Sequence, residues 1–157
     1  MPILWTCDPS TLPPHNGKGF VLKGREPLFD LLALQTLLRS GQLNLGDDQH
    51  CWVATDSCWD ELEQLKWTLG NQVTRLLLAL RPGKRKQGGD FVNAQWCADS
   101  YGGMFACDSY KVRVDEHNNF CRSPNGLEYY VKFSIDESGG LYLALLQCHL
   151  DRFRMRT

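Results

Sequence analysis

A strict alternation of apolar and polar side chains between Leu127 and Ile135 constrains the fold more than any other feature of the sequence. Successive side chains of a β-strand point to opposite faces of a sheet, so this segment has one face for a core and one for water or a ligand. The apolar face holds Leu127, Tyr129, Val131, Phe133 and Ile135, and the polar face holds Glu128, Tyr130, Lys132 and Ser134. The segment predicts a strand in a sheet that is covered on one side.

The chain then turns back on itself. Residues 136–140 include two glycines, which accept the positive φ that tight hairpins need, and predict a turn. Residues 141–150 predict the returning strand, which is apolar on both faces as far as Leu146. A strand that is apolar on both faces is typical of the centre of a sheet, so we expect it to be covered by helices on one side and largely buried on the other.

Two upstream segments extend the predicted sheet. Residues 106–115 alternate as 127–135 do, and residues 91–98 are a weaker strand candidate. We therefore expect a three- to four-stranded antiparallel sheet. Its polar face carries Lys111, Arg113, Tyr130 and Lys132.

Helical patterns occupy the N-terminal half of the chain. Pro27 is suited to the first position of a helix that Gly41 ends, and apolar residues recur between them at helical spacing. Residues 55–57 are competent caps for a second helix, which breaks at Gly70 and resumes as an apolar helical end over 73–80. The order predicts an α+β fold with the N-terminal helices packed on one face of the sheet.

Length and composition indicate an ordinary globular chain. The 157 residues fit one domain, which we place at 26–157 behind an extended arm at 1–25 with a possible short strand at 20–22. No segment approaches the ~20 apolar residues of a membrane span, and the N-terminus has no signal-peptide pattern. We therefore expect a cytoplasmic protein with no membrane association.

The charge is nearly balanced, at a formal net value of −1. Residues 81–157 carry 11 Lys and Arg against 9 Asp and Glu, a small excess that is compatible with a nucleic-acid ligand but does not establish one. The basic, glycine-rich loop with Lys84, Arg85 and Lys86 has two readings, a solvated loop or a phosphate-contacting loop. It lacks the residue order of a P-loop.

The seven cysteines indicate neither a disulfide framework nor a zinc site, because their number is odd and neither Cys-x-x-Cys nor zinc-finger spacing occurs. We predict no metal and no cofactor. A thiol enzyme is one functional alternative. Its nucleophile would be Cys107, Cys121 or Cys148, with His149 or His117 as the base; Cys148 and His149 would point to opposite faces of a strand and could not pair with each other.

Several segments, taken in succession, carry a resemblance to a known family. They are Leu37–Gln42 at the end of the first helix, the apolar helical end at 73–80, Asp90–Ala94, Asp99, Asp108–Lys111, Tyr130–Ile135 and Leu145–His149. In this order and spacing, residues 28–150 resemble the MqsR-type mRNA interferases, toxins of bacterial toxin–antitoxin systems with a RelE-like fold.

The resemblance implies metal-independent cleavage of single-stranded mRNA, held in check by a cognate antitoxin protein. Tyr130 matches the family's functional tyrosine and Lys132 its neighbouring lysine. Asn93 stands where the family has a functional lysine, and His149 stands where a basic residue ends the last strand; a histidine there is suited to general acid or base catalysis. We expect Tyr130, Lys132 and His149 to be catalytic. The residues expected to bind RNA are Lys111, Arg113, Lys84, Arg85 and Lys86.

A non-enzymatic alternative uses the same surface. Tyr and Lys are common on the solvated face of an amphipathic strand, and Tyr and Trp are common interface anchors. The protein would then be a binding or immunity-type module whose polar sheet face contacts a protein partner. The sequence leaves the RNA preference and the oligomeric state open.

Overall fold

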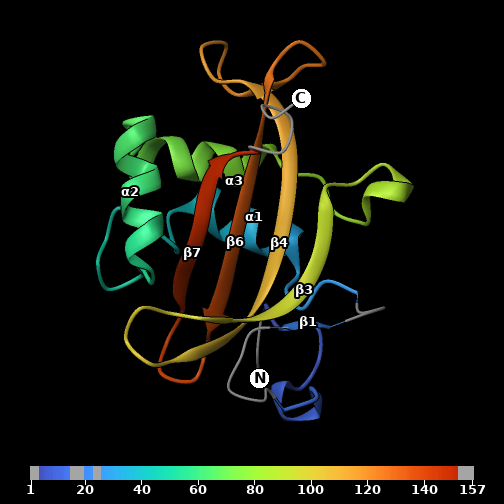
Figure 1. Cartoon of the computed structure of the whole chain (residues 1–157), viewed down its shortest axis with the longest axis vertical. Coiled ribbons are helices and arrows are strands. Elements are labelled where there is room, and N and C mark those ends of the chain that lie inside the picture. The colour runs from blue at the N-terminus through green and yellow to red at the C-terminus, as the bar shows by residue number, and fades with distance from the viewer. Residues whose placement is uncertain (1–3, 15–19, 23–25, 152–157) are drawn as a thin grey trace.

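The computed structural model describes residues 4–14, 20–22 and 26–151, and these form an α+β fold with one mixed sheet (Figure 1). His15, Lys18 and the C-terminal tail after Asp151 lie outside the described residues. The strands are β1 (Phe20–Leu22), β2 (Cys51–Val53), β3 (Phe91–Ala98), β4 (Met104–Asp115), β5 (Cys121–Arg122), β6 (Leu127–Asp136) and β7 (Tyr142–Leu150). The helices are α1 (Leu31–Ser40), α2 (Asp56–Leu65) and α3 (Thr74–Ala79), with short 3₁₀ turns at Pro9–Thr11 and Arg85–Gln87 and a π turn at Leu69–Val73.

The sheet has the order β1-β3-β4-β6-β7-β2, with β5 paired to the far end of β4. The four predicted strands are all present and form its antiparallel middle, β3-β4-β6-β7. The predicted number of strands was too small, because the sheet has seven, and it is not purely antiparallel, because β2 runs parallel to β7. The short strand expected at 20–22 is present as β1. The strands β2 and β5 were not predicted, because three and two residues are too few for alternation to be recognised.

The helices α1 and α3 lie behind the sheet in Figure 1, while α2 stands beside β7. The main core lies between this helical layer and the apolar faces of the central strands. The core face predicted for β6 is confirmed at Tyr129, Val131, Phe133 and Ile135, which are all buried, but Leu127 at the start of the strand is exposed. On the other face Lys132 and Ser134 are buried as well, so that face is less open than the alternation predicted. The returning strand β7 is central, as predicted, between β6 and β2.

The first helix begins later than the sequence predicted. Asp30 is its N-cap and accepts a hydrogen bond from the Ala33 N–H at 3.1 Å, whereas Pro27 lies before the helix. Gly41 ends it in the left-handed region, as expected, with φ of 81°. Residues 27–29 stay outside the helix because the backbone N–H groups of Leu28 and Phe29 bind the buried Asp108 carboxylate of β4, at 2.9 and 3.0 Å.

The second helical region follows its sequence signals more closely. Thr55 caps α2, with its hydroxyl accepting from the Cys58 N–H at 3.1 Å. The break was predicted too late, because α2 ends at Leu65 with Lys66 in the left-handed region. Gly70 instead lies within the π turn, which leads directly into α3. Leu76 and Leu77 of α3 have no exposed surface, whereas Arg75 is exposed, so α3 buries one side in the core.

The hairpin between β3 and β4 curls across the open side of the sheet. Ser100 at its tip donates its N–H to the Ala54 carbonyl and accepts from the Asp56 N–H, at 3.0 and 2.8 Å, so it reaches the opposite edge of the sheet. Figure 1 shows this hairpin crossing the lower part of β6 and β7. A second, small core lies beneath it, formed by Ala54, Cys107, Ala144 and Leu146 with Trp52, Cys97 and Phe105 at its margin. Only part of the predicted polar face is therefore open.

The N-terminal residues expected to form an extended arm contact the rest of the fold. Within residues 1–25, β1 pairs with β3 and Trp5 forms a bridge with Phe29. The domain boundary at residue 25 stays a prediction.

No helix among the described residues has the length and apolar composition that a membrane span requires.

The Gln35 side chain joins α1 to the end of α3. It is 3% exposed, and its amide donates to the carbonyls of Leu77 and Leu80, both at 2.9 Å. These carbonyls lie at the end of α3, where the Leu77 carbonyl accepts only the capping Leu80 N–H at 3.3 Å besides Gln35. Gln35→Met keeps the volume but removes both side-chain hydrogen bonds at this buried helix end, so we expect the free energy of unfolding to fall by about 1–3 kcal/mol. Urea denaturation would measure this, with the exposed Gln49→Met as a control; equal stability of the two variants would contradict the role assigned to Gln35.

The Asp108 carboxyl makes stability depend on pH. Burial raises its pKa to about 7, and the N–H donors of Leu28 and Phe29 only partly oppose this rise. A raised folded-state pKa gives a stabilising contribution that is complete below the unfolded pKa of about 4 and is lost as pH rises through the folded value. The excess stability of the wild type over Asp108→Asn should therefore shrink between about pH 4 and pH 8 in thermal melts. If the stability difference between the wild type and Asp108→Asn did not change with pH, the raised pKa of Asp108 would be contradicted.

Candidate functional site

A bulge in β7 decides which residues share the polar face. Opposite β6, Phe133 pairs with Leu145 but Lys132 pairs with Gln147, so one extra residue of β7 is inserted at this point. The shift places His149 opposite Tyr130, and Cys148 points into the main core. With an unbroken register His149 would lie opposite Tyr129 on the helix side, so the bulge redirects it.

The three residues predicted to be catalytic lie together. The rings of Tyr130 and His149 are stacked, with centroids 5.3 Å apart and an angle of 20° between their planes. The Lys132 Nζ lies 5.6 Å from the centre of the Tyr130 ring, within the range of a cation–π contact. Tyr130 and His149 are partly exposed, whereas Lys132 is only 7% exposed. The Lys132 side chain is thus almost fully buried, whereas the Tyr130 and His149 rings reach the protein surface.

His149 is oriented from two sides. Its Nδ1 lies 2.6 Å from the Leu150 carbonyl oxygen, which can only accept, so Nδ1 carries the proton in this contact and Nε2 of the neutral ring is free to take one. The Glu61 Oε2 lies 3.8 Å from Nε2. Glu61 is held in place because its other oxygen accepts the Cys148 N–H at 3.1 Å, covering the edge of β7 that β2 leaves open.

The hydroxyl of Tyr130 belongs to a short polar chain. Gln95 on β3 donates to it at 3.3 Å and also donates to the Asn93 side-chain oxygen at 3.0 Å. Ser109 on β4 donates to the same Asn93 oxygen at 2.7 Å. Because the tyrosine oxygen accepts from Gln95, its own proton can point outward to a ligand. Asn93 therefore supports the site through Gln95.

A thiol pair borders Lys132. Cys97 on β3 is partly exposed and Cys107 on β4 is fully buried. A hydrogen bond from the Cys107 thiol, followed by the charge of Lys132, lowers the pKa of Cys97 to about 7 against the opposing effect of burial. Burial raises the pKa of Cys107, which stays a thiol. Lys132 thus has a readily ionised thiol and a tyrosine ring as its neighbours.

Most of the predicted RNA-binding cations are already paired with acids. Lys111 lies 3.3 Å from Asp151, and both Arg113 and Arg85 approach Glu128, at 3.9 and 3.4 Å. Arg85 is thereby brought to the end of the polar face. The Lys84 Nζ lies 3.3 Å from a carboxylate oxygen of Glu26, away from this face. Lys86 is exposed in the 3₁₀ turn.

The thiol-enzyme alternative finds little support in the geometry. Cys107 and Cys148 have no exposed surface, and burial raises the pKa of both thiols, which disfavours a nucleophilic thiolate. Cys121 and His117 are both exposed in the β4–β6 connection, where the Asn118 amide contacts the Cys121 sulfur at 3.5 Å. Among the described residues, no group of three or more His, Cys, Asp or Glu side chains is placed to hold a metal ion.

Comparison with known proteins gives no relative: no family model, no curated protein and no solved structure matches this chain.

Three contributors to the site were not predicted from the sequence. Gln95 and Cys97 follow Asn93 at every second position of β3, so the alternation that identified the other strands could have placed them on the polar face. Glu61 gave no such signal. It reaches His149 only because α2 packs along the edge of β7, which is a tertiary contact.

The contact between Lys132 and Cys97 predicts the reactivity of the thiol. The rate at which iodoacetamide alkylates Cys97 should rise with pH and reach half its maximum at about pH 7, since the thiolate is the reactive form. Lys132→Met removes a stabilising charge; if the pKa rises by about one unit, the thiolate fraction at neutral pH falls roughly fivefold. Peptide mass spectrometry would resolve Cys97 from the other thiols. Lys66→Met is the control, and an unchanged pH midpoint in Lys132→Met would disprove the contact.

Proposed function

We propose that the polar face is the active site of a metal-independent endoribonuclease that cleaves single-stranded RNA, as in an mRNA interferase toxin. The observation that carries the proposal is the joint placement of His149, Tyr130 and Lys132, which are an acid–base residue, a hydroxyl donor and a cation. The two rings are stacked, and the Lys132 ammonium lies 5.6 Å from the centre of the Tyr130 ring. The sequence resemblance to MqsR-type interferases supplies the substrate class. It also supplies the finer expectations of a RelE-like fold, a cognate antitoxin and a cytoplasmic location.

The first step assigns the base to His149. Its unprotonated Nε2 accepts the proton of the ribose 2′-hydroxyl, whose oxygen then attacks the neighbouring phosphorus. The resulting imidazolium gains a counter-charge from Glu61, 3.8 Å away. The attack forms the 2′,3′-cyclic phosphate and breaks the bond to the 5′-oxygen, which leaves as an alcohol by taking the proton of the Tyr130 hydroxyl. Proton exchange with water afterwards restores Tyr130 and neutral His149, and the cleavage step itself consumes no water.

Lys132 and Tyr130 act on the charge that develops. The ammonium stabilises the phosphorane, and its low exposure strengthens this interaction because little water screens it. The Tyr130 hydroxyl, held by Gln95, donates its hydrogen bond to a phosphate oxygen or to the departing 5′-oxygen. The exposed part of the Tyr130 and His149 rings offers a surface on which an unpaired base can stack.

The ion pairs on the same face limit how strongly RNA can bind. A phosphate must compete with Asp151 for Lys111 and with Glu128 for Arg113 and Arg85. Substrate affinity should therefore be modest and only weakly dependent on salt, because few counterions are released when RNA binds.

The decisive experiment is cleavage of a long single-stranded RNA by the purified chain in EDTA. We expect cyclic-phosphate ends, and a loss of about 100-fold or more in rate for His149→Gln and for Lys132→Met, consistent with general-base and charge-stabilisation effects. Tyr130→Phe should lose rate while keeping the ring stack. Tyr142→Phe, His117→Gln and Lys66→Met are matched controls at positions outside the face. Full activity in the three site variants, or none in the wild type, would refute the proposal.

One observation favours a second candidate. Because Asp151 and Glu128 neutralise Lys111, Arg113 and Arg85, the face presents alternating charges and two rings, which suits a protein partner as well as RNA. On this reading the chain is a non-enzymatic binding or immunity-type module. It would give no cleavage in the assay above, and substitution of Tyr130 by Ala would weaken the capture of that partner.

A further inference from the structure

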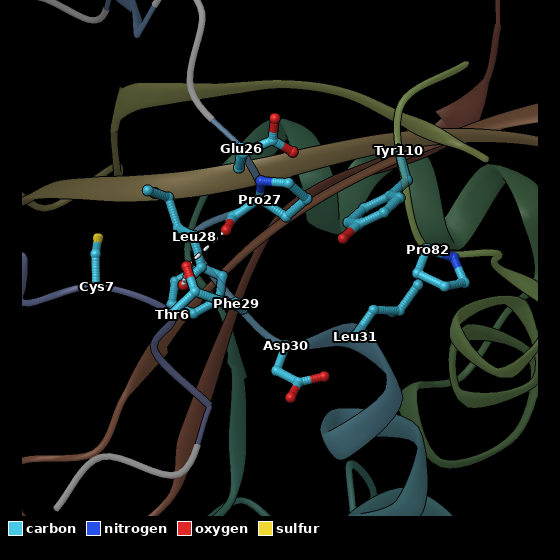
Figure 2. Close-up of a pocket in the computed structure, with 10 residues that line it drawn as sticks. All are labelled: Thr6, Cys7, Glu26, Pro27, Leu28, Phe29, Asp30, Leu31, Pro82 and Tyr110. Atoms are coloured by element: carbon cyan, nitrogen blue, oxygen red, sulfur yellow. Dashed lines mark hydrogen bonds between the residues drawn. The ribbon is translucent and has the colours of Figure 1, made fainter. Parts of the chain in front are cut away.

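A cavity of about 580 Å³ opens on the helix side of the sheet, separate from the Tyr130 face. Its walls come from four segments that are distant in sequence: residues 6–7, residues 26–31, Pro82 and Tyr110 of β4 (Figure 2). Pro27, Leu31 and Pro82 make much of the lining apolar. This volume lies within the range of small-molecule sites, about 300–1,000 Å³.

The base of the cavity holds an unsatisfied polar group. Tyr110 is 0% exposed, and its hydroxyl has no hydrogen-bond partner among the described residues. Figure 2 shows the hydroxyl pointing into the space that the labelled residues enclose. The ring cannot easily turn away, since it lies between Phe91 and Phe133, with centroids at 5.6 and 6.0 Å. Buried hydroxyls are nearly always paired, so this one lacks a partner that a ligand can supply.

The charges around the cavity are acidic. Two of its ten lining residues, Glu26 and Asp30, are acids, and no Lys, Arg or His is among them. Lys84 contacts Glu26 at 3.3 Å, but this pair is largely exposed and can exchange. Burial, followed by the negative charges of Asp108, Asp90 and Asp30, raises the pKa of Tyr110, so the phenol remains neutral. Its oxygen can therefore accept a hydrogen bond.

We propose that this cavity binds a cationic nitrogen group on an apolar stem, a primary ammonium or an amidinium-type group. The Tyr110 oxygen accepts one N–H of the cation, Glu26 and Asp30 provide the opposite charge, and the prolines and Leu31 contact the stem. An anion would meet two carboxylates, and a purely apolar ligand would leave the phenol unpaired. The site is independent of the proposed ribonuclease activity.

Calorimetric titration of the full chain with benzamidine and benzylamine tests this. We expect both cations to bind, with benzyl alcohol and benzoate at least about tenfold weaker, because a hydrogen bond to a charged group contributes about 1.5–3 kcal/mol. Equal binding of benzoate or benzyl alcohol, or no binding of either cation, would overturn the proposal.

Two variants locate the binding. Tyr110→Phe deletes only the unpaired hydroxyl, so it should fold at least as stably as the wild type and bind benzamidine at least about tenfold more weakly. Asp30→Asn keeps a competent helix cap and should weaken only the cations. Tyr142→Phe and Asp60→Asn are the controls, and unchanged affinity in Tyr110→Phe would overturn the assignment. Titration with N-acetyl-lysine amide and N-acetyl-arginine amide distinguishes a free amine from a basic side chain of a peptide as the natural source.

Discussion

The structure depends on the two-sided character of the central strands. In β4 and β6 every second side chain must be removed from water, and the helices α1 and α3 provide the surface that does so. The remaining side chains are thereby gathered on the opposite face, where residues of β3, β4, β6 and β7 meet. The candidate site is a consequence of this division: the apolar positions determine the core, and the polar positions between them have only one other place to lie.

Two irregularities modify this simple arrangement. The bulge in β7 moves His149 to the polar face, and the curl of the β3–β4 hairpin covers the lower part of that face with a second apolar cluster. As a result Lys132 lies between the apolar cluster under the hairpin and the open part of the polar face with Tyr130 and His149. A lysine in this position needs compensation, which Cys97 and the Tyr130 ring provide. The same partial burial is what allows its charge to act strongly on a bound phosphate.

Among the described residues, nearly all buried polar side-chain atoms have a partner. Gln35 satisfies the end of α3, Asp108 holds the segment before α1, and Asp90 is paired with Arg122 and the Arg81 N–H. Two buried atoms lack a hydrogen bond, the Tyr110 hydroxyl and the Arg113 Nη2. The Arg113 Nη2 still has the Glu128 carboxylate as a counter-charge 3.9 Å away, so the Tyr110 hydroxyl is the one that indicates a ligand. The two proposed sites lie on opposite faces of β4, since Lys111 points to one and Tyr110 to the other.

The sequence by itself determined the α+β class, the four long strands, a helix cap within residues 55–57 and the stop at Gly41, because each rests on local periodicity or on the backbone preference of a residue. It also placed Tyr130, Lys132, Lys111 and Arg113 on one face. Tertiary structure decided the rest. The short strands β2 and β5 exist through pairing with longer ones, the start of α1 is delayed by the hydrogen bonds to Asp108, and His149 joins Tyr130 through a bulge. Glu61, Asp151 and Glu128 act on the face through contacts between residues distant in sequence. Local signals fix which elements form, but long-range packing fixes register, edge pairing and the neutralisation of charge.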